Sequence, residues 1–150
     1  MDFKLSEDQL MIRQMARDFC EKEIAPMAAQ LDDASQFPKE NIKKMAGLGF
    51  MGMMAPHELG GAGLDVLSYV LVLEEIAAAC ASTAVTMSVN NSLYLGPILK
   101  FGFEEQKKKF IPDFAAGKKL GAYALSEPGS GSDAAALTTT AEKKGDKYIL

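Results

Sequence analysis

The sequence predicts a mainly α-helical fold that gives way to short β-strands near its C-terminus. Over most of the 150 residues, apolar side chains recur at helical spacing, and capping residues stand where these stretches begin. After Lys119 the pattern changes to β-branched alternation around turn residues. With 48% apolar and 24% charged residues, the composition is that of a folded globular domain, not a disordered chain.

The first predicted helix begins at Ser6, which Gln9 follows at the capping-box spacing. One stripe of this helix is apolar and the opposite stripe is charged or amide-bearing. Because Pro26 lacks a backbone N–H, we expect it to kink or interrupt the helix. The apolar stripe consists of Ile12, Met15, Ala16, Phe19, Cys20 and Ile24.

Two further helices are expected in the next part of the chain. Pro38 suits a first helical position, and Gly47 and Gly49 would end that second helix. A glycine-rich connector follows. Asp65, as an N-cap, then predicts a third helix over residues 66–81.

Residues 83–101 predict a more deeply buried helix. This segment carries large apolar side chains, and Gly102 would end the helix. Residues 104–116 predict another amphipathic helix, which Gly117 would end.

The last thirty residues are predicted to be β. Residues 120–126 look extended, residues 127–133 read as a turn-rich loop, and residues 137–150 alternate around Gly145-Asp146. Two or three short strands leave an unpaired edge and cannot form a self-sufficient sheet. We therefore expect the natural protein to continue past Leu150.

Charge argues against nucleic acid as a partner. The formal net charge is −4 and the pI is near 5.0, so the average surface repels phosphate backbones. The one dense basic run, residues 107–109, follows Glu104 and Glu105 and reads as a solvated helix face.

Cysteine usage and the N-terminus indicate a reducing compartment. Cys20 and Cys80 lie far apart without a CxxC or CxH partner, so neither a disulfide framework nor a metal site is expected. Residues 1–5 carry no signal peptide, and Glu74 and Glu75 stop the longest apolar stretch, so no membrane association is expected. Bacterial cytoplasm fits best, or the mitochondrial matrix for a processed eukaryotic form.

Several motif matches fail on their context. Residues 47–52 match G-x-G-x-x-G by letter, but they end a helix instead of following a strand. Residues 60–63 lack the lysine and hydroxyl of a P-loop, and His57 is the only histidine, so no triad or metal cluster can be assembled. Glu74 and Glu75 diverge on a helix and do not form an acid/base pair. The nine methionines read as core residues.

Residues 121–133, which we call the serine-glycine loop, differ in composition from the motifs above. Glycines and hydroxyl residues concentrate where an extended segment passes into a loop, so N–H groups and the hydroxyls of Ser130 or Ser132 could meet a phosphate or a cofactor carbonyl. Tyr123 and Leu125 alternate with alanines and could face a flat ring. A plain strand followed by a capped turn would account for the same residues.

Residues 123–133 read Y-A-L-S-E-P-G-S-G-S-D, which resembles the signature of the acyl-CoA dehydrogenase family. Residues 87–102 look most like short-chain, butyryl-type members. The resemblance implies an N-terminal helical-bundle domain over residues 1–118 and the first strands of a middle β-barrel domain over residues 119–150, with the C-terminal helical domain absent. Supporting matches are residues 5–9, 56–61, 74–77, 101–102 and 105–107.

The same resemblance implies an activity and a set of site residues. Family members use FAD to convert acyl-CoA thioesters to trans-2-enoyl-CoA, and the glutamate that removes the α-proton would lie beyond Leu150. Ser126 stands where many members have threonine, which keeps the hydroxyl. Leu95 and Leu99 would shorten the acyl cavity and favour C4 substrates. The residues expected at the flavin are Tyr123, Leu125, Ser126, Gly131 and Ser132, and Ser132 would also contact the CoA thioester.

The resemblance also implies partners: a short-chain acyl-CoA, electron-transferring flavoprotein as electron acceptor, and three further copies in a homotetramer. Two alternatives stay open. The chain could be a non-catalytic helical module that binds an acyl group or a protein partner. Within the family, it could act on branched, aryl or glutaryl thioesters, or pass electrons to oxygen as an oxidase.

Overall fold

The computed structural model describes residues 4–150, so part of the expectation about residues 1–5 lies outside the described residues. It confirms a mainly helical chain with a small sheet at its C-terminal end. The α-helices are α1 (Glu7–Phe19), α2 (Ala25–Asp33), α3 (Lys39–Gly47), α4 (Val66–Ala79), α5 (Ala81–Ser88), α6 (Gly96–Phe101), α7 (Glu104–Phe110) and α8 (Pro112–Ala115). The π-helical turns are η1 (Cys20–Ile24) and η4 (Val89–Leu95), and the 3-10 turns are η2 (Phe50–Gly52), η3 (His57–Leu59) and η5 (Ala134–Ala136).

Helix α1 begins as its sequence predicts. The hydroxyl of Ser6 accepts from the N–H of Gln9 (3.2 Å), and the N–H of Ser6 donates to Oε1 of Gln9 (3.0 Å), which completes the capping box. Most of the expected apolar stripe packs inward, but Met15 is 39% exposed and lies at the margin of the packed face.

Pro26 interrupts the first helix, as expected. The chain passes from α1 through the π turn η1 into α2, and the N–H of Ala25 donates to the carbonyl of Cys20, five residues back. A proline removes one hydrogen bond of the α-helical ladder, and the widened turn before it absorbs the irregularity.

Two predicted boundaries shift slightly. Helix α3 starts at Lys39 because Pro38 is its N-cap, and Gly49 follows the helix with a φ of 78°. The carboxylate of Asp65 caps α4 by accepting from the N–H of Ser68 (2.6 Å), as predicted. Helix α4 ends at Ala79, two residues early, because Cys80 adopts an extended conformation.

The predicted buried helix is irregular, although it ends at Gly102 as expected. It consists of α5, η4 and α6 and starts at Ala81. The last predicted helix is divided at Ile111 into α7 and α8, where Pro112 opens the second piece, and Gly117 follows with a φ of 65°.

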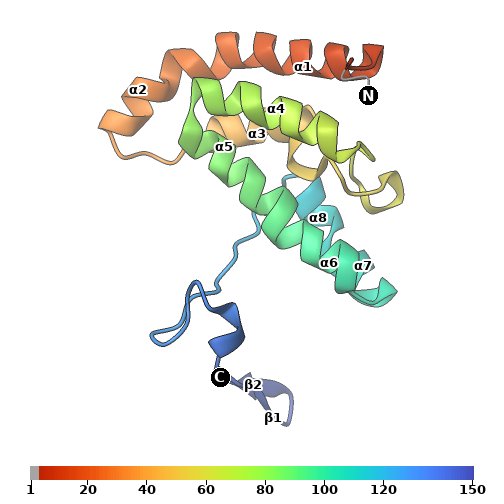
Figure 1. Cartoon of the computed structure of the whole chain (residues 1–150), viewed down its shortest axis with the longest axis vertical. Helices are drawn as coiled ribbons and strands as arrows, with labels where there is room; N and C mark the ends of the chain where they lie inside the picture. The colour runs from red at the N-terminus through yellow and green to blue at the C-terminus, as the bar shows by residue number, and fades with distance from the viewer. Residues whose placement is uncertain (1–3) are drawn as a thin grey trace.

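The helices enclose two adjoining cores. Helix α1 packs along α4, and α4 packs along α5 (Figure 1). The larger core contains Ala16, Cys20, Ile24, Ile42, Met45, Phe50, Met51, Met53, Tyr69, Val72, Ile76, Ala84 and Met87. The smaller core contains Ala55, Leu59, Leu95, Ile111 and Ala115. Four methionines are thus buried as predicted, whereas Met11, Met15 and Met27 are exposed.

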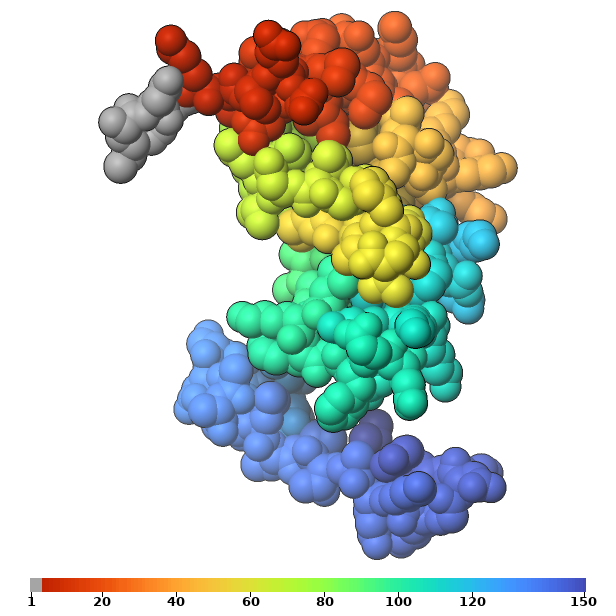
Figure 2. Space-filling model, turned by 90° about the vertical axis from the view of Figure 1, so that its right-hand side faces the viewer, coloured from red at the N-terminus to blue at the C-terminus, as the bar shows by residue number. Residues whose placement is uncertain are grey.

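The C-terminal residues form a hairpin that lies apart from the helices (Figures 1 and 2). Strands β1 (Glu142–Lys144) and β2 (Lys147–Ile149) pair antiparallel, with Lys143 opposite Tyr148. Gly145 occupies the turn with a φ of 61°, at the predicted place. Residues 120–126 belong to neither helix nor strand, so the expected extended segment has no strand partner. None of the helices in residues 4–150 has the length and apolarity needed to cross a membrane.

Candidate functional site

The chain leaves the helices at Gly121, the first residue of the serine-glycine loop. The N–H of Gly121 donates to Oδ1 of Asn90 (2.8 Å). A side chain has no room here, because a Cβ on Gly121 would lie 2.2 Å from Cγ of Tyr94. Tyr94 in turn packs on Phe114, with ring centroids 4.2 Å apart. The outgoing chain is therefore held closely against the buried helix at this residue.

Asn90 joins three segments of backbone around this exit. It is fully buried, and its Nδ2 donates to the carbonyl oxygens of Met51 (2.7 Å) and Phe114 (3.1 Å) while its Oδ1 accepts from Gly121. One side chain thus fixes the connector after α3, the end of α8 and the start of the loop. A buried amide needs such partners, because an unsatisfied one costs about 1–3 kcal/mol.

Asn91 does the same for the connector alone. It is also buried, its Oδ1 accepts from the N–H of Met53 (2.8 Å), and its Nδ2 donates to the carbonyls of Phe50 (2.8 Å) and Met87 (3.1 Å). Neither asparagine was predicted from the sequence as a site residue. The available signal was two adjacent amides in a helix predicted to be buried, where each must find hydrogen-bond partners.

A tight turn shapes the middle of the loop. The N–H of Glu127 donates to the carbonyl of Ser130 (2.7 Å), and the N–H of Ser130 donates back to Glu127 (3.1 Å). The hydroxyl of Ser130 is buried and donates to the carbonyl of Asp133 (2.7 Å). Ser130 therefore supports the loop from within and is not available to a ligand.

The carboxylate of Glu127 holds the far side of the loop. It accepts from the N–H of Thr138 (2.8 Å), the N–H of Thr139 (3.0 Å) and the hydroxyl of Thr138 (3.2 Å). These bonds, first the one from the Thr138 backbone, lower the pKa of Glu127 to about 2. The loop is thus closed by an ionised carboxylate.

The five residues expected at a flavin lie on the surface of this loop. Tyr123 is 50% exposed and Leu125 is 36% exposed, and Ser126, Gly131 and Ser132 are exposed as well. Within residues 4–150 the hydroxyls of Ser126 and Ser132 make no hydrogen bond. Their hydrogen-bonding capacity is therefore free for a ligand, and a Cβ on Gly131 would meet nothing within 4 Å.

The two leucines expected at the acyl cavity lie on the helix that carries Asn90. Leu95 is 1% exposed and belongs to the smaller core, and Leu99 is partly buried against that core. Leu95 thus packs the helices together, whereas Leu99 keeps some free surface.

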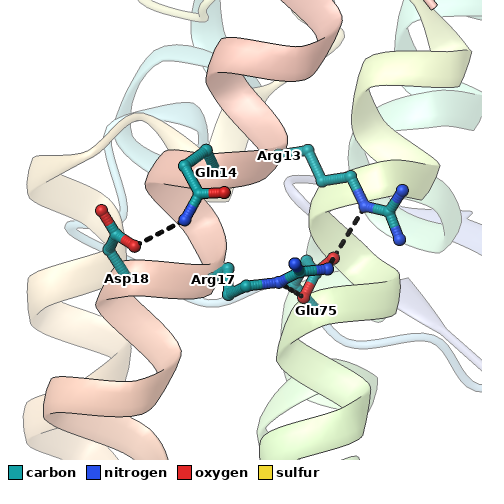
Figure 3. Close-up of polar contacts among 5 residues, drawn as sticks. All are labelled: Arg13, Gln14, Arg17, Asp18 and Glu75. Carbon is teal, nitrogen blue, oxygen red and sulfur yellow. Dashed lines mark hydrogen bonds and ion pairs between the residues drawn. The ribbon is translucent and has the colours of Figure 1, made fainter.

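A charged cluster joins α1 to α4 (Figure 3). Nε of Arg13 donates to the carboxylate of Glu75 (2.7 Å), and Arg17 donates to it through Nε (3.0 Å) and a terminal nitrogen (2.8 Å). The hydrogen bond from Arg17 is the main reason that the pKa of Glu75 is lowered. Glu74 is exposed, so the two glutamates diverge as predicted. Glu75 is an interhelix ion-pair residue.

The remaining motifs are structural in the described residues. Gly47 ends α3 and Gly52 lies in a 3-10 turn, so residues 47–52 lack the strand-turn-helix context of a dinucleotide site. Nδ1 of His57 lies 3.1 Å from the carbonyl of Gly61, inside the connector. No group of three potential metal ligands occurs in residues 4–150.

A family model and the sequences of known proteins both relate this chain to acyl-CoA dehydrogenases. Residues 6–118 match the family model described as "Acyl-CoA dehydrogenase, N-terminal domain". The mitochondrial short-chain specific acyl-CoA dehydrogenase of Homo sapiens is 56% identical over 147 residues, which is 98% of this chain and 36% of the human protein. The chain therefore spans little more than a third of that relative.

Solved structures extend the likeness to the fold. Butyryl-CoA dehydrogenase from Megasphaera elsdenii has a TM-score of 0.89 and 41% identity, over 97% of this chain and 39% of the other. A chain in the structure of the electron transferring flavoprotein of Acidaminococcus fermentans has a TM-score of 0.94 and 49% identity, over 100% of this chain and 40% of the other. The acyl-CoA dehydrogenase from Bacillus anthracis, complexed with FAD, has a TM-score of 0.84 and 40% identity, over 92% of this chain and 24% of the other.

Proposed function

Because the chain belongs to the acyl-CoA dehydrogenase family, we propose that the full-length protein containing it oxidises short-chain acyl-CoA thioesters to trans-2-enoyl-CoA with FAD. The observation that carries the proposal is the serine-glycine loop, in which Ser126 and Ser132 are exposed and their hydroxyls make no hydrogen bond within residues 4–150. The identity to a short-chain specific enzyme over 147 residues supports the substrate class. Since the chain covers 36% of that relative, the activity is proposed for a longer protein that contains it.

The loop residues fit a flavin by their chemistry. Ser126 offers a hydroxyl that can hydrogen-bond a ring carbonyl, and Tyr123 and Leu125 offer exposed aromatic and aliphatic surface. Gly131 leaves its backbone open to a phosphate, and Ser132 can reach the phosphate region or the CoA thioester. When bound, FAD supplies the hydride acceptor. Donors placed at the ring before reaction stabilise the charge that develops on reduction.

Acyl chain length is the finer part of the proposal. Leu99, with the buried Leu95 behind it, would limit the depth of the acyl cavity. Each methylene that a pocket excludes is worth about 1 kcal/mol. The full-length enzyme is therefore expected to turn over butyryl-CoA faster than palmitoyl-CoA, and equal or better turnover of palmitoyl-CoA contradicts the short-chain assignment.

We also propose the domain arrangement, electron acceptor, oligomeric state and compartment of the enzyme. Residues 1–118 would form the helical domain and residues 119–150 the start of a β domain, and the catalytic glutamate would come from a later part of the protein. Electron-transferring flavoprotein would accept the electrons, and the assembly would be a homotetramer. The compartment would be bacterial cytoplasm, or the mitochondrial matrix for a processed eukaryotic form.

The deciding experiment uses the full-length protein. It is expected to purify yellow and to lose its visible flavin absorption when butyryl-CoA is added. Ser126→Ala should weaken FAD binding and shift the flavin absorption bands. Thr140→Ala, which removes an exposed hydroxyl from the same segment outside the signature, should do neither.

A colourless protein that is indifferent to FAD would contradict the proposal and favour a non-catalytic binding module. Comparing rates of reoxidation by oxygen and by electron-transferring flavoprotein separates an oxidase from a dehydrogenase.

A further inference from the structure

We infer that Asn90 is a positioning residue that sets the serine-glycine loop in place relative to the helix carrying Leu95 and Leu99. The part of this inference that concerns flavin rests on the proposed function. The part that concerns the loop rests on the structure of this chain alone. Asn90 itself would touch neither flavin nor substrate, because it is fully buried under the exit of the loop.

The hydrogen bond from Gly121 to Asn90 links two parts of the molecule that otherwise make few contacts. Among residues 5–150 it is the only hydrogen bond that joins residues 120–150 to the helical part. Figures 1 and 2 show the C-terminal residues extending away from the helices beyond this point. The orientation of the loop therefore depends on how firmly Gly121 is held.

Residues 122–126, which include Tyr123, Leu125 and Ser126, lie between two residues that are held by hydrogen bonds. Within the described chain, residues 122–126 make no hydrogen bond of their own. Gly121 fixes one end of this stretch to Asn90, and Glu127 fixes the other end to the loop itself. At about 3.5 Å per residue, Tyr123 lies within about 7 Å of the Gly121 anchor. A displacement at Gly121 therefore acts on the start of the stretch that carries Tyr123.

Tyr94 restricts where Gly121 can lie. A Cβ on Gly121 would lie 2.4 Å from Cβ of Tyr94, so the segment can sit this close only as glycine. Tyr94 is supported by Phe114, whose carbonyl accepts from Asn90. The Tyr94 ring, Gly121 and the side-chain amide of Asn90 together restrict the position of the start of the loop.

Asn91 provides a matched control inside the protein. Both asparagines lie on η4, both are buried, and each makes three hydrogen bonds to backbone groups. Only Asn90 binds the loop. Truncating either residue should cost similar stability, so a difference between the two variants reports on the loop.

The experiment compares Asn90→Ala and Asn91→Ala in the full-length protein, at a temperature where circular dichroism shows both folded. Hydrogen exchange followed by mass spectrometry measures the peptide covering residues 118–125. Exchange there should speed up about tenfold in Asn90→Ala, the factor expected when one ordinary hydrogen bond is lost, and stay near wild type in Asn91→Ala. FAD binding should weaken, and flavin reduction by butyryl-CoA should slow, in Asn90→Ala alone.

Gly121→Ala is the second variant, in case Asn90→Ala does not fold. Its Cβ clashes with Tyr94 and displaces the loop, while Asn90 keeps its bonds to Met51 and Phe114. It should reproduce the exchange and flavin effects of Asn90→Ala.

Equal exchange in the two asparagine variants would overturn the inference. Faster exchange in Asn90→Ala with unchanged flavin binding and reduction would overturn the part of it that concerns flavin. A colourless wild-type protein would contradict the proposed function instead, and the exchange measurement would still decide whether Asn90 holds the loop.

Discussion

At the scale of single residues, Glu75 shows how one carboxylate can bind two elements together. Its side chain is 11% exposed and accepts three hydrogen bonds from Arg13 and Arg17 across the α1–α4 contact. Gln14 and Asp18, also on α1, hydrogen-bond to each other and, within residues 4–150, make no hydrogen bond to α4 (Figure 3). Position on the helix therefore decides which charges contribute to packing.

Glu75→Gln is expected to lower the free energy of unfolding by about 1–2 kcal/mol, because charge-assisted bonds are lost and two partly exposed arginines keep their charge. Urea denaturation of the chain measures this. Glu74→Gln is the control, since Glu74 is exposed and should change stability by less than about 0.5 kcal/mol. Equal effects of the two substitutions would contradict the role of Glu75.

The effect of Glu75 should depend on pH in a defined direction. Its pKa in the folded chain is lowered from the ordinary value of 4.5. A lowered folded pKa means that the contribution is complete above the unfolded value and is lost as pH falls through the folded value. The stability difference between wild type and Glu75→Gln should stay constant above about pH 5 and shrink below pH 4.5. A difference that grows on acidification would contradict this prediction.

Glu127 should titrate with a pKa of about 2, because three hydrogen bonds from Thr138 and Thr139 stabilise its ionised form. Its stabilisation of the loop is then present above pH 4.5 and is lost as pH falls toward 2. The amide resonances of Thr138 and Thr139 should shift over this range. Glu127→Gln should abolish that titration, and an ordinary carboxyl pKa at Glu127 would contradict the prediction.

At the scale of elements, the sequence predicted the signals that act locally. The capping box at Ser6, the Asp65 cap and the stop at Gly102 all lie where expected, because each depends on residues three or four positions apart. The π turns η1 and η4 were not predicted. A widened turn follows from how neighbouring elements pack, and no local pattern in the sequence marks it.

Glycine at position 61 is required by packing in the connector. A Cβ there would lie 2.1 Å from the carbonyl oxygen of Ala55, so Gly61→Ala should lower the free energy of unfolding by about 1–3 kcal/mol or more. Gly47→Ala is the control, because a Cβ at Gly47 would meet nothing within 4 Å and alanine favours a helix. Thermal unfolding of both variants decides the point, and equal melting temperatures would contradict it.

At the scale of the whole molecule, the helices pack around two buried cores, whereas strands β1 and β2 lie exposed. All six residues of β1 and β2 are exposed, and Tyr148 and Leu150 are 67% and 89% exposed. A two-stranded hairpin of this kind is marginally stable in water.

The 150-residue chain by itself is expected to bind FAD poorly and to show no dehydrogenation of butyryl-CoA. The physical reason is that one hydrogen bond among residues 5–150 holds the loop to the helices, and that the residues expected at the flavin are exposed. Gel filtration with FAD, followed by visible absorption of the protein peak, measures binding. Stoichiometric flavin and activity in the isolated chain would contradict this expectation.

The sequence by itself determined the helical class, most helix ends, the turn of the hairpin and the family, because caps, periodicity and a specific loop motif are readable over a few residues. It also indicated the signature residues of the loop, whose flavin contacts stay a prediction. Only the tertiary structure decided that Asn90 and Asn91 bind three backbone segments, that Glu75 joins α1 to α4, and that Leu95 is buried. Each of these depends on residues about twenty or more positions apart, or on which face a side chain turns to its neighbours, and that is settled when the elements pack.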